Sequence, residues 1–458
     1  MTLESVIAVE TAQPRVHLIS LGCARNRVDS EVMLGSLLRT GWVITDEPAT
    51  ADAIIVNTCG FIASAKEESI DTILQAASLK KNKPELKVVV TGCLTQRYKS
   101  QLALGLPEVD LFIGTDEFPK IADYLKTPPP KGTVLAKRTH YLYTEEMPRV
   151  NTLAKFSAYV KVAEGCQHNC SFCIIPAIRG RLRSRPVASV IKEAEALVKD
   201  GVVEINLIAQ DLAAYGRDFK GDDRADLLKL LRELVKVEGL EWIRPLYVYP
   251  ENISDDFLDF LASEPKLVKY LDIPVQHASD AVLKRMNRGI DRAGLRSIFA
   301  KLRERVPEVA IRTSVMVGFP GETDEEFEEL VAFVAEQKFR HLGCFAYSRE
   351  EGTVAGRLSD QVSEDVKAAR LDRVMEMQKA ISRENLQALV GKILPVLIDG
   401  PSEESDLLWQ GRLSTQAPEV DGIVLINDGH VKAGQIQNVL ITEAHDYDLV
   451  GEVVGSLH

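Results

Sequence analysis

Residues 165–173 read Gly-Cys-Gln-His-Asn-Cys-Ser-Phe-Cys, so three cysteines follow one another with the spacing C-x3-C-x2-C. Three thiolates this close can hold three irons of a 4Fe-4S cluster and leave the fourth iron without a protein ligand. The alternative is a structural zinc site, which usually takes four protein ligands. His168 is the nearest fourth ligand, but it lies between the cysteines, where reaching the same metal would strain the loop. The spacing therefore favours a cluster held by Cys166, Cys170 and Cys173, hereafter the barrel cysteines.

The barrel cysteines follow the first of six apolar stretches that alternate with helical patterns. The predicted strands are 158–162, 204–208, 243–249, 270–273, 310–317 and 341–347, and the clearest helices are 187–199, 227–237 and 324–337. Strands that alternate with helices predict a parallel sheet with covered faces. Six units are too few for the standard closed barrel of eight, so we expect an open, partial (β/α)6 barrel. A long helical pattern, 364–389, leads out of it.

The N-terminal part also alternates strands and helices. Predicted strands are 16–21, 53–56, 88–90 and 111–113, and predicted helices are 29–39, 63–79 and 118–125. This pattern predicts a parallel, Rossmann-like sheet domain. The run Pro128-Pro129-Pro130 with Gly132 then breaks the pattern and is expected to be a linker.

Three further cysteines, Cys23, Cys59 and Cys93, hereafter the N-terminal cysteines, each come directly after one of these strands. The carboxyl ends of parallel strands share one edge of a sheet, which is where ligands bind. A single cysteine at a strand end is more often an unreactive core residue. Three of the chain's seven cysteines at strand ends are hard to attribute to chance. We therefore predict a second three-cysteine iron–sulfur site. Cys344 lies inside the sixth barrel strand and is expected to be core.

The C-terminal part carries five short strand patterns, at 394–398, 408–413, 422–426, 438–443 and 449–454. Short strands separated by Gly, Asp and Pro predict a small antiparallel β-barrel. The expected organisation is thus an α/β chain with domains at 14–127, 150–388 and 389–458.

Composition limits the class of protein. The chain has 458 residues, of which 45% are hydrophobic and 27% charged, as in ordinary globular proteins. The first ten residues carry no Lys or Arg, and no apolar run approaches the length of a membrane span, so we expect a cytoplasmic protein without membrane contact. The net charge is −12, and the last 68 residues hold eleven acidic and three basic residues. Such a segment repels phosphate and attracts a basic partner, unless it is simply a solvated acidic face.

A C-x3-C-x2-C loop after the first strand of a partial barrel resembles the signature of radical S-adenosylmethionine enzymes. In that family the open iron binds the methionine part of the cofactor, and one electron from a low-potential donor cleaves it to a 5′-deoxyadenosyl radical. With the N-terminal cysteines and the terminal β-barrel, which resembles a TRAM domain, the chain resembles the methylthiotransferases over about residues 15–453. The resemblance implies two 4Fe-4S clusters, S-adenosylmethionine as cofactor, and insertion of sulfur and a methyl group at an unactivated C–H bond.

Two branches of that family compete. Residues 20–31, 270–277 and 446–452 resemble the branch that modifies the β-carbon of an aspartate in small-subunit ribosomal protein twelve, although Ala24 replaces an expected proline. The other branch modifies an adenosine in transfer RNA. An enzyme that binds transfer RNA needs Lys and Arg side chains to contact the phosphates. The acidic terminal segment favours the first branch, because ribosomal proteins are generally basic. A third possibility is a non-catalytic iron–sulfur or zinc protein that binds the ribosome.

Several weaker candidates lie near the cofactor in this interpretation. The family places an aromatic residue such as Phe172 near the adenine, although Phe172 could equally be core. Gln210 and Gln276 follow the second and fourth barrel strands, at the rim where such barrels are active. Gly318 and Gly321 follow the fifth strand, where glycines could admit a nucleoside or simply make a turn. The basic run Arg179, Arg181, Arg183 and Arg185 could neutralise a carboxylate substrate or pair with surface acids.

Overall fold

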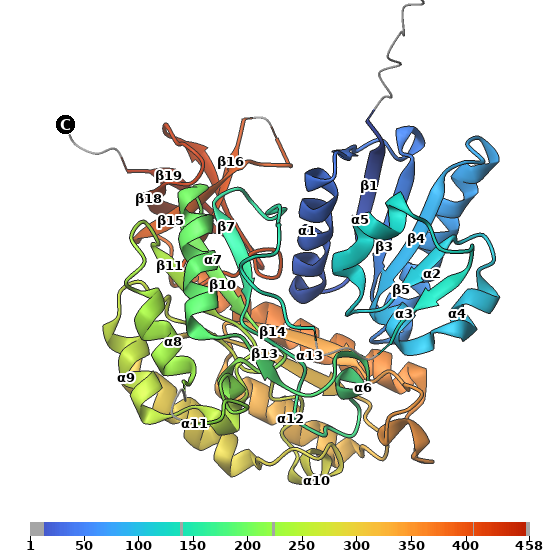
Figure 1. The fold of residues 1–458 in the computed structure, drawn as a ribbon. Helices are drawn as coiled ribbons and strands as arrows, with labels where there is room; N and C mark the ends of the chain where they lie inside the picture. The colour runs from blue at the N-terminus through green and yellow to red at the C-terminus, as the bar shows by residue number, and fades with distance from the viewer. Residues whose placement is uncertain (1–12, 138–140, 222–224, 406, 455–458) are drawn as a thin grey trace, which may run out of the picture. The chain divides into compact units, whose positions relative to one another are not determined.

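The computed structural model describes residues 13–137, 141–221, 225–405 and 407–454 (Figure 1). The chain divides into two compact units. The N-terminal unit comprises Met1–Tyr141 and Glu146–Val150, and the large unit comprises Leu142–Glu145 and Asn151–His458.

The N-terminal unit is built on a six-stranded parallel sheet in the order β2-β1-β3-β4-β5-β6. The strands are β1 (Arg15–Ser20), β2 (Val43–Ile44), β3 (Ala53–Thr58), β4 (Lys87–Gly92), β5 (Leu111–Ile113) and β6 (Thr133–Leu135). The helices are α1 (Ala24–Arg39), α2 (Ala63–Ser78), α3 (Cys93–Tyr98), α4 (Ser100–Gly105) and α5 (Ile121–Lys126). Every residue of β3 is buried, as expected for a central parallel strand covered on both faces.

This sheet confirms the predicted parallel domain and extends it. The short strands β2 and β6 were not predicted, because two or three residues cannot show a period of two. The proline run is a turn between α5 and β6 inside the N-terminal unit, so its interpretation as a linker between domains is wrong. Helix α1 begins at Ala24, directly after Cys23 and earlier than the predicted start at residue 29.

The large unit contains the predicted open barrel. Its strands form two parallel three-stranded sheets, ordered β11-β10-β7 and β12-β13-β14. A parallel bridge between Ile243 and Leu267 connects the two sheets. The strands are β7 (Ser157–Lys161), β10 (Glu204–Ile208), β11 (Trp242–Pro245), β12 (Tyr270–Asp272), β13 (Ala310–Val317) and β14 (His341–Ala346). No pairing joins β7 to β14 in the described part of the chain, so the barrel is open there.

Helices lie on the outer side of these strands (Figure 1). They are α7 (Val187–Lys199), α8 (Leu227–Leu234), α9 (Asp255–Ser263), α10 (Asp280–Arg285), α11 (Arg292–Arg305) and α12 (Asp324–Gln337). The helix α12 begins with a capping box, in which Thr323 and Glu326 each accept a hydrogen bond from the other's backbone N–H. Its predicted bounds, and those of α7, match the structure at both ends.

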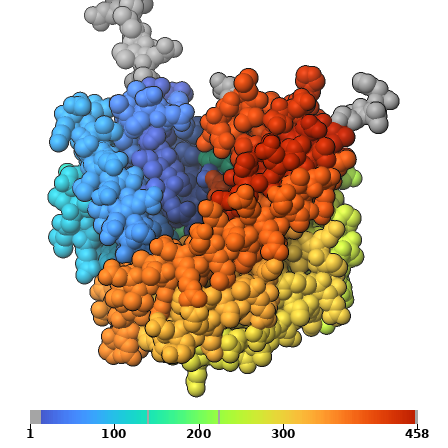
Figure 2. Space-filling view, turned by 180° about the vertical axis from the view of Figure 1, so that it is seen from behind, coloured from blue at the N-terminus to red at the C-terminus, as the bar shows by residue number. Residues whose placement is uncertain are grey.

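The long helix α13 (Glu364–Gln387) leads into a closed five-stranded terminal barrel, ordered β15-β16-β17-β19-β18. Its strands are β15 (Ile393–Pro401), β16 (Trp409–Leu413), β17 (Val424–Asp428), β18 (Ile436–Ala444) and β19 (Leu449–Val453). Four of its pairings are antiparallel, as predicted, and β17 pairs with β19 in parallel. Figure 2 shows the red terminal barrel against the orange segment that contains α13, where Lys379 pairs with Asp446 at 3.2 Å.

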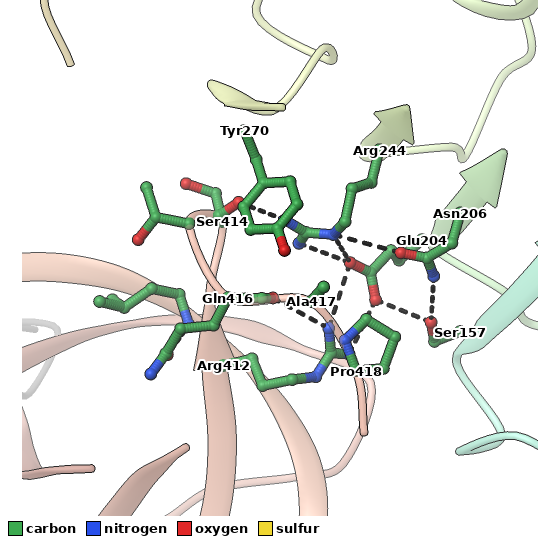
Figure 3. A network of polar contacts seen from close by, with 12 residues as sticks. Ser157, Glu204, Asn206, Arg244, Tyr270, Arg412, Ser414, Gln416, Ala417 and Pro418 are labelled. Carbon is green, nitrogen blue, oxygen red and sulfur yellow. Dashed lines mark hydrogen bonds and ion pairs between the residues drawn. The ribbon is translucent and has the colours of Figure 1, made fainter. Parts of the chain in front are cut away.

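A buried charge network joins the terminal barrel to the open barrel (Figure 3). Glu204 of β10 accepts hydrogen bonds from Arg244 Nη2 of β11 at 2.8 Å and from Arg412 Nη2 of β16 at 2.7 Å. Arg412 also pairs with Asp399 of β15, at 2.8 Å. Burial alone raises the pKa of Glu204, but the two guanidinium groups outweigh it and lower the pKa to about 2. The carboxylate is therefore charged at neutral pH and links the two barrels through its ion pairs with Arg244 and Arg412.

Among the described residues, no helix is long and apolar enough to cross a membrane.

Candidate functional site

The barrel cysteines lie in a loop whose base is closed by a short antiparallel pair. Strand β8 (Ala163–Glu164) precedes the loop, and β9 (Arg183–Ser184) pairs with it afterwards. Cys166 N donates to Gly180 O at 3.1 Å, which draws the two sides together. A Cβ at Gly165 would stand 2.2 Å from Arg181 O, and the backbone there has φ +79°, so only glycine fits. The loop that carries the cysteines is thus fixed at its base.

Contacts from α10 and the turn after it fix the middle of the loop. Ser171 N donates to Met286 O at 3.0 Å, and Ser171 Oγ donates to Arg285 O at 2.8 Å. Asn287 Nδ2 donates to Asn169 O at 2.8 Å. The cysteine loop therefore depends on a segment more than one hundred residues away in sequence.

Cys170 has a charged and an aromatic neighbour that sequence reasoning did not identify. Its Sγ lies 3.8 Å from Arg288 Nη1 and 3.9 Å from Tyr249 Oη. The Arg288 guanidinium also stacks over the Tyr249 ring, 3.9 Å from its centroid. Arg288 and Tyr249 therefore form one wall beside the Cys170 sulfur. Tyr249 follows β11 at the barrel rim, which is the only signal in the sequence that could have indicated it.

His168 is committed to a different interaction. Its Nε2 lies 2.7 Å from Asp211 Oδ2, and its ring stacks on Tyr249 at 3.9 Å with an interplanar angle of 9°. The imidazole is therefore turned toward Asp211, which does not fit the alternative of a four-ligand zinc site. In the described residues no three His, Cys, Asp or Glu side chains are arranged to hold a single metal ion. A 4Fe-4S cluster takes one thiolate per iron, so its ligands need not converge on one point.

A buried acid next to the loop organises one side of the rim. Glu164 is 4% exposed and accepts from Lys161 Nζ at 3.0 Å, Arg179 Nη1 at 3.2 Å and Gln210 Nε2 at 2.8 Å. Burial raises the pKa of Glu164, but Lys161 and Arg179 more than offset this and hold the pKa below its usual range. Gln210 Oε1 is buried without a hydrogen-bond partner among the described residues, so it is an unsatisfied acceptor.

The basic run predicted from sequence is largely structural. Arg179 pairs with Glu164, and Arg185 pairs with Glu193 at 2.5 Å, with both guanidinium groups buried. Arg183 donates to two backbone carbonyls of the same loop. Arg179 and Arg185 therefore pair with acids of the protein itself, and Arg183 stabilises the loop through its backbone.

The remaining rim candidates take part in packing. Gln276 has φ +70° and bridges to β13 through its backbone, with Met316 N donating to Gln276 O at 2.7 Å. A Cβ at Gly318 would stand 2.3 Å from Lys367 Cγ of α13, so this glycine admits a side chain of the protein. Gly321 has φ +74°, a backbone conformation that favours glycine, so the turn alone explains the glycine at this position. Phe172 packs on an apolar cluster that includes Phe319 and Tyr347.

The N-terminal cysteines lie where the sequence analysis placed them, at the carboxyl ends of β1, β3 and β4. Cys23 caps α1, Cys59 follows β3, and Cys93 opens α3. A Cβ at Gly22 would stand 3.0 Å from Cys59 Cβ and 3.4 Å from its Sγ. A Cβ at Gly60 would stand 2.8 Å from the backbone of Leu94. The three cysteine loops are therefore in contact, and glycines make the close approach possible.

Amide and hydroxyl side chains hold these loops together. Asn26 Nδ2 donates to Leu21 O at 2.8 Å and to Thr58 O at 3.1 Å, which links the loops before Cys23 and Cys59. Ser69 Oγ accepts from Cys59 N at 3.1 Å and donates to Cys59 O at 3.0 Å. Arg97 Nη1 of α3 also donates to Gly60 O at 2.9 Å, next to Cys59. The start of α1 at Cys23 favours negative charge there.

Cys344 fits its predicted role as core. It is 8% exposed, and burial raises the pKa of its thiol to about 12, so it stays a neutral thiol. The donor sets that remain are two groups of three thiols at two strand edges, which fit iron–sulfur clusters in chemistry and number.

Comparison with known proteins identifies the family. Three family models match the chain: Uncharacterized protein family UPF0004 over residues 15–114, the Radical SAM superfamily over 160–334 and the TRAM domain over 390–454. RimO of Anaeromyxobacter sp. (strain Fw109-5) is 50% identical over 97% of this chain and 94% of its own length. RimO of Geobacter sulfurreducens is 47% identical over 97% of this chain and 100% of its own length. The chain belongs to the RimO family.

Both relatives are described as ribosomal protein uS12 methylthiotransferases. Membership of the RimO family confirms the resemblance stated from the cysteine motifs and domain order. Among solved structures, the radical S-adenosylmethionine methyltransferase TsrM of Kitasatospora setae, with cobalamin and a 4Fe-4S cluster bound, has a TM-score of 0.55. It is 16% identical and covers 75% of this chain and 77% of its own, so the likeness is one of fold. The predicted fold class is confirmed.

Proposed function

We propose that this RimO-family chain methylthiolates the β-carbon of an aspartate in ribosomal protein uS12. One observation carries the proposal: the chain matches uS12 methylthiotransferases over nearly its full length and keeps two sets of three cysteines at two strand edges. When bound, two 4Fe-4S clusters and two molecules of S-adenosylmethionine would supply the radical, the methyl group and the sulfur attachment.

The protein's own residues divide this work. The predicted segments 14–127, 150–388 and 389–458 would hold the sulfur-handling cluster, the radical cluster and the substrate, respectively. The barrel cysteines would ligate the radical cluster, with Arg288 beside the sulfur of Cys170. Gln210, whose buried Oε1 has no hydrogen-bond partner among the described residues, would contact the cofactor at the barrel rim. The other proposed contacts are Phe172, Gln276, Gly318 and Gly321. The N-terminal cysteines would ligate the second cluster.

The partners follow from the same proposal. A basic ribosomal protein suits the acidic terminal barrel, on which Glu403, Glu404, Asp428 and Glu443 are exposed. Transfer RNA is an unfavourable substrate for that surface, because phosphate contacts need basic groups. A low-potential electron donor is required for reductive cleavage. Because ribosomes assemble in the cytoplasm, we propose that the enzyme acts there.

Mass spectrometry of cells that lack this enzyme tests the function. We expect uS12 from these cells to lose the mass of one methylthio group on an aspartate, while transfer RNA modification is unchanged. Complementation with the intact gene should restore the modified peptide. Loss of a methylthio group from transfer RNA instead would show that the adenosine-modifying branch is correct, and no change in either molecule would favour a non-catalytic protein.

A further inference from the structure

A cavity of about 220 Å³ lies inside the open barrel, and the residues that line it come from outside the cysteine loop. Its lining includes Tyr159 of β7, Asp272 of β12, Arg312 and Ser314 of β13, Phe345 of β14 and Val420. Val420 belongs to the β16–β17 loop of the terminal barrel, so the terminal barrel forms part of the wall. Phe345 and Val420 are 51% and 50% exposed, although they belong to a barrel strand and to a loop docked on the barrel. The cavity therefore presents apolar surface to whatever enters it.

Arg312 is the cation of this cavity. Its Nη1 donates to Asp421 Oδ1 at 3.2 Å, next to Val420 in the same loop. The nearest acid on the other edge of the guanidinium is Asp272, whose Oδ1 lies 3.9 Å from Nε, beyond hydrogen-bond distance. Within the described residues, Nε and Nη2 make no hydrogen bond, and 17% of the side chain is exposed. These two donors form the edge with which arginine binds a carboxylate through two parallel hydrogen bonds.

Asp421 is fixed independently of Arg312. It accepts from Tyr270 Oη at 2.7 Å and from Ala417 N at 2.8 Å, and His341 Nδ1 lies 3.4 Å away. Its side chain is 1% exposed. An acid held by several donors can hold a guanidinium in one orientation.

The loop that carries Asp421 is itself anchored by the charge network of Figure 3. Arg244 Nη1 donates to Ser414 O at 2.7 Å, and His341 Nε2 lies 2.8 Å from Thr415 O. Arg412, at the end of β16, is held by Glu204. The wall of the cavity formed by the terminal barrel is thus rigidly attached to the open barrel.

We propose that Arg312 binds the carboxylate of the substrate aspartate in this cavity, and that Asp421 of the terminal barrel positions it. The inference rests on the proposed function, because it assigns that reaction's substrate side chain to a site. It makes the terminal barrel part of the specificity pocket as well as a docking surface. Asparagine, which lacks the charge, should be bound poorly, because the Nε and Nη2 edge of Arg312 would then have no anion to bind.

The test compares binding of purified uS12 with a uS12 variant in which the modified aspartate is replaced by asparagine. Titration with the full-length, cluster-loaded enzyme gives the ratio of the two dissociation constants. A hydrogen-bonded charge pair predicts a ratio of about tenfold to a hundredfold for the unaltered enzyme. Arg312→Gln should bring the ratio close to one, since the two substitutions remove the same interaction. Asp421→Asn should lower the ratio without abolishing it.

Two variants serve as controls. Arg296→Gln removes an exposed guanidinium that pairs with Glu336 on the surface, and the ratio should stay unchanged. Arg312→Lys keeps the charge but offers no two-donor edge, so it should give an intermediate ratio and covers the case that Arg312→Gln does not fold.

Other outcomes overturn the inference. If Arg312→Gln and Arg312→Lys both discriminate as the unaltered enzyme does, Arg312 does not bind the carboxylate. If Asp272→Asn abolishes the discrimination and Arg312→Gln does not, Asp272 and not Arg312 distinguishes aspartate from asparagine, and the inference is wrong. If the unaltered enzyme forms no methylthiolated uS12 at all, both the proposed function and this inference are wrong. The product assay detects this failure, whereas the ratio of dissociation constants tests the inference alone.

Discussion

The cysteines of the two proposed cluster sites differ in what surrounds them. Cys170 has a guanidinium and a phenol within 4 Å, whereas Cys59 is held by a serine hydroxyl through its backbone. The barrel loop thus has a cation beside the sulfur of one of its cysteines. The N-terminal loops are arranged for close approach, with Gly22 against Cys59. The surroundings agree with separate roles for the two sites.

Replacing the N-terminal cysteines together by Ala should separate these roles. We expect loss of roughly half the iron, with the barrel cluster retained. The variant should still cleave S-adenosylmethionine to 5′-deoxyadenosine but form no methylthiolated uS12, because the sulfur-handling ligands are gone. Replacing the barrel cysteines should abolish both. Anaerobic chromatography of 5′-deoxyadenosine and mass spectrometry of the peptide measure the two products. Methylthiolated peptide from the N-terminal variant would contradict the two-cluster mechanism.

At the scale of elements, the sequence predicted helices with a clear apolar period and motifs contained in a short stretch of residues. The helices α7 and α12 were predicted to the residue, because apolar side chains recur along them at helical spacing. The start of α1 was missed because Ala24–Val28 is mostly polar and carries no apolar period. The contacts of Cys170 with Tyr249 and Arg288, and of Arg312 with Asp421, join residues about eighty to one hundred and twenty positions apart. Only the fold brings such side chains together, so the positions of the six cysteines after strands were predictable and the side chains around them were not.

The pair β8 and β9 predicts a specific sensitivity at Gly165. Gly165→Ala would place a Cβ 2.2 Å from Arg181 O, so the base of the cysteine loop must open. We expect the barrel cluster to be lost, leaving roughly half the iron and no 5′-deoxyadenosine. Gly391→Ala is the matched control, because Gly391 has a similar φ of +83° but nothing within 4 Å of the added atom. It should carry only the backbone strain of about 1–2 kcal/mol and keep its iron. Equal iron in the two variants would show that the loop base tolerates opening.

At the scale of the whole chain, the charge of the terminal segment acts in two ways. Asp399 and Asp421 are turned inward toward arginines, and Asp446 faces Lys379. Asp421 thus pairs with the open barrel, Asp446 pairs with α13, and Asp399 pairs with Arg412 inside the terminal barrel. The count of acidic residues therefore overstates the charge available to a partner. Composition cannot distinguish an acid in an internal ion pair from one on the surface, and the sequence analysis could not do so either.

Glu204→Gln tests the internal attachment. The variant leaves two buried guanidinium groups without their shared anion, which should lower the free energy of unfolding of the large unit by about 3–5 kcal/mol at pH 7. The ordinary pKa of Glu204 is 4.5 and its folded value is about 2. A lowered pKa stabilises the fold fully above the ordinary value, so the advantage of the unaltered protein should shrink between about pH 4.5 and 2. Urea unfolding at several pH values in this range measures the difference in the free energy of unfolding between the two proteins.

Glu336→Gln, in an exposed ion pair, is the control and should lower the free energy of unfolding by less than about 1 kcal/mol. An equally small cost for Glu204→Gln would exclude the network as the attachment.

The acids left on the surface set the expected docking behaviour of the whole molecule. Glu403 and Glu404 are exposed on the β15–β16 loop, and Asp406 lies outside the described residues. Reversing Glu403 and Glu404 to Lys should weaken binding of uS12, mainly by slowing association, because exposed complementary charges steer the encounter. Added salt should weaken binding of uS12 to the unaltered enzyme and reduce the difference in association rate between the unaltered enzyme and the variant, since salt screens surface charges.

The matched control is reversal of Glu233 and Glu238, two acids of the open barrel remote in sequence from this loop. Surface plasmon resonance at two salt concentrations measures the association rates. Rates that respond to neither the reversal nor salt would exclude electrostatic docking, and tight binding of transfer RNA at physiological salt would contradict the choice of partner.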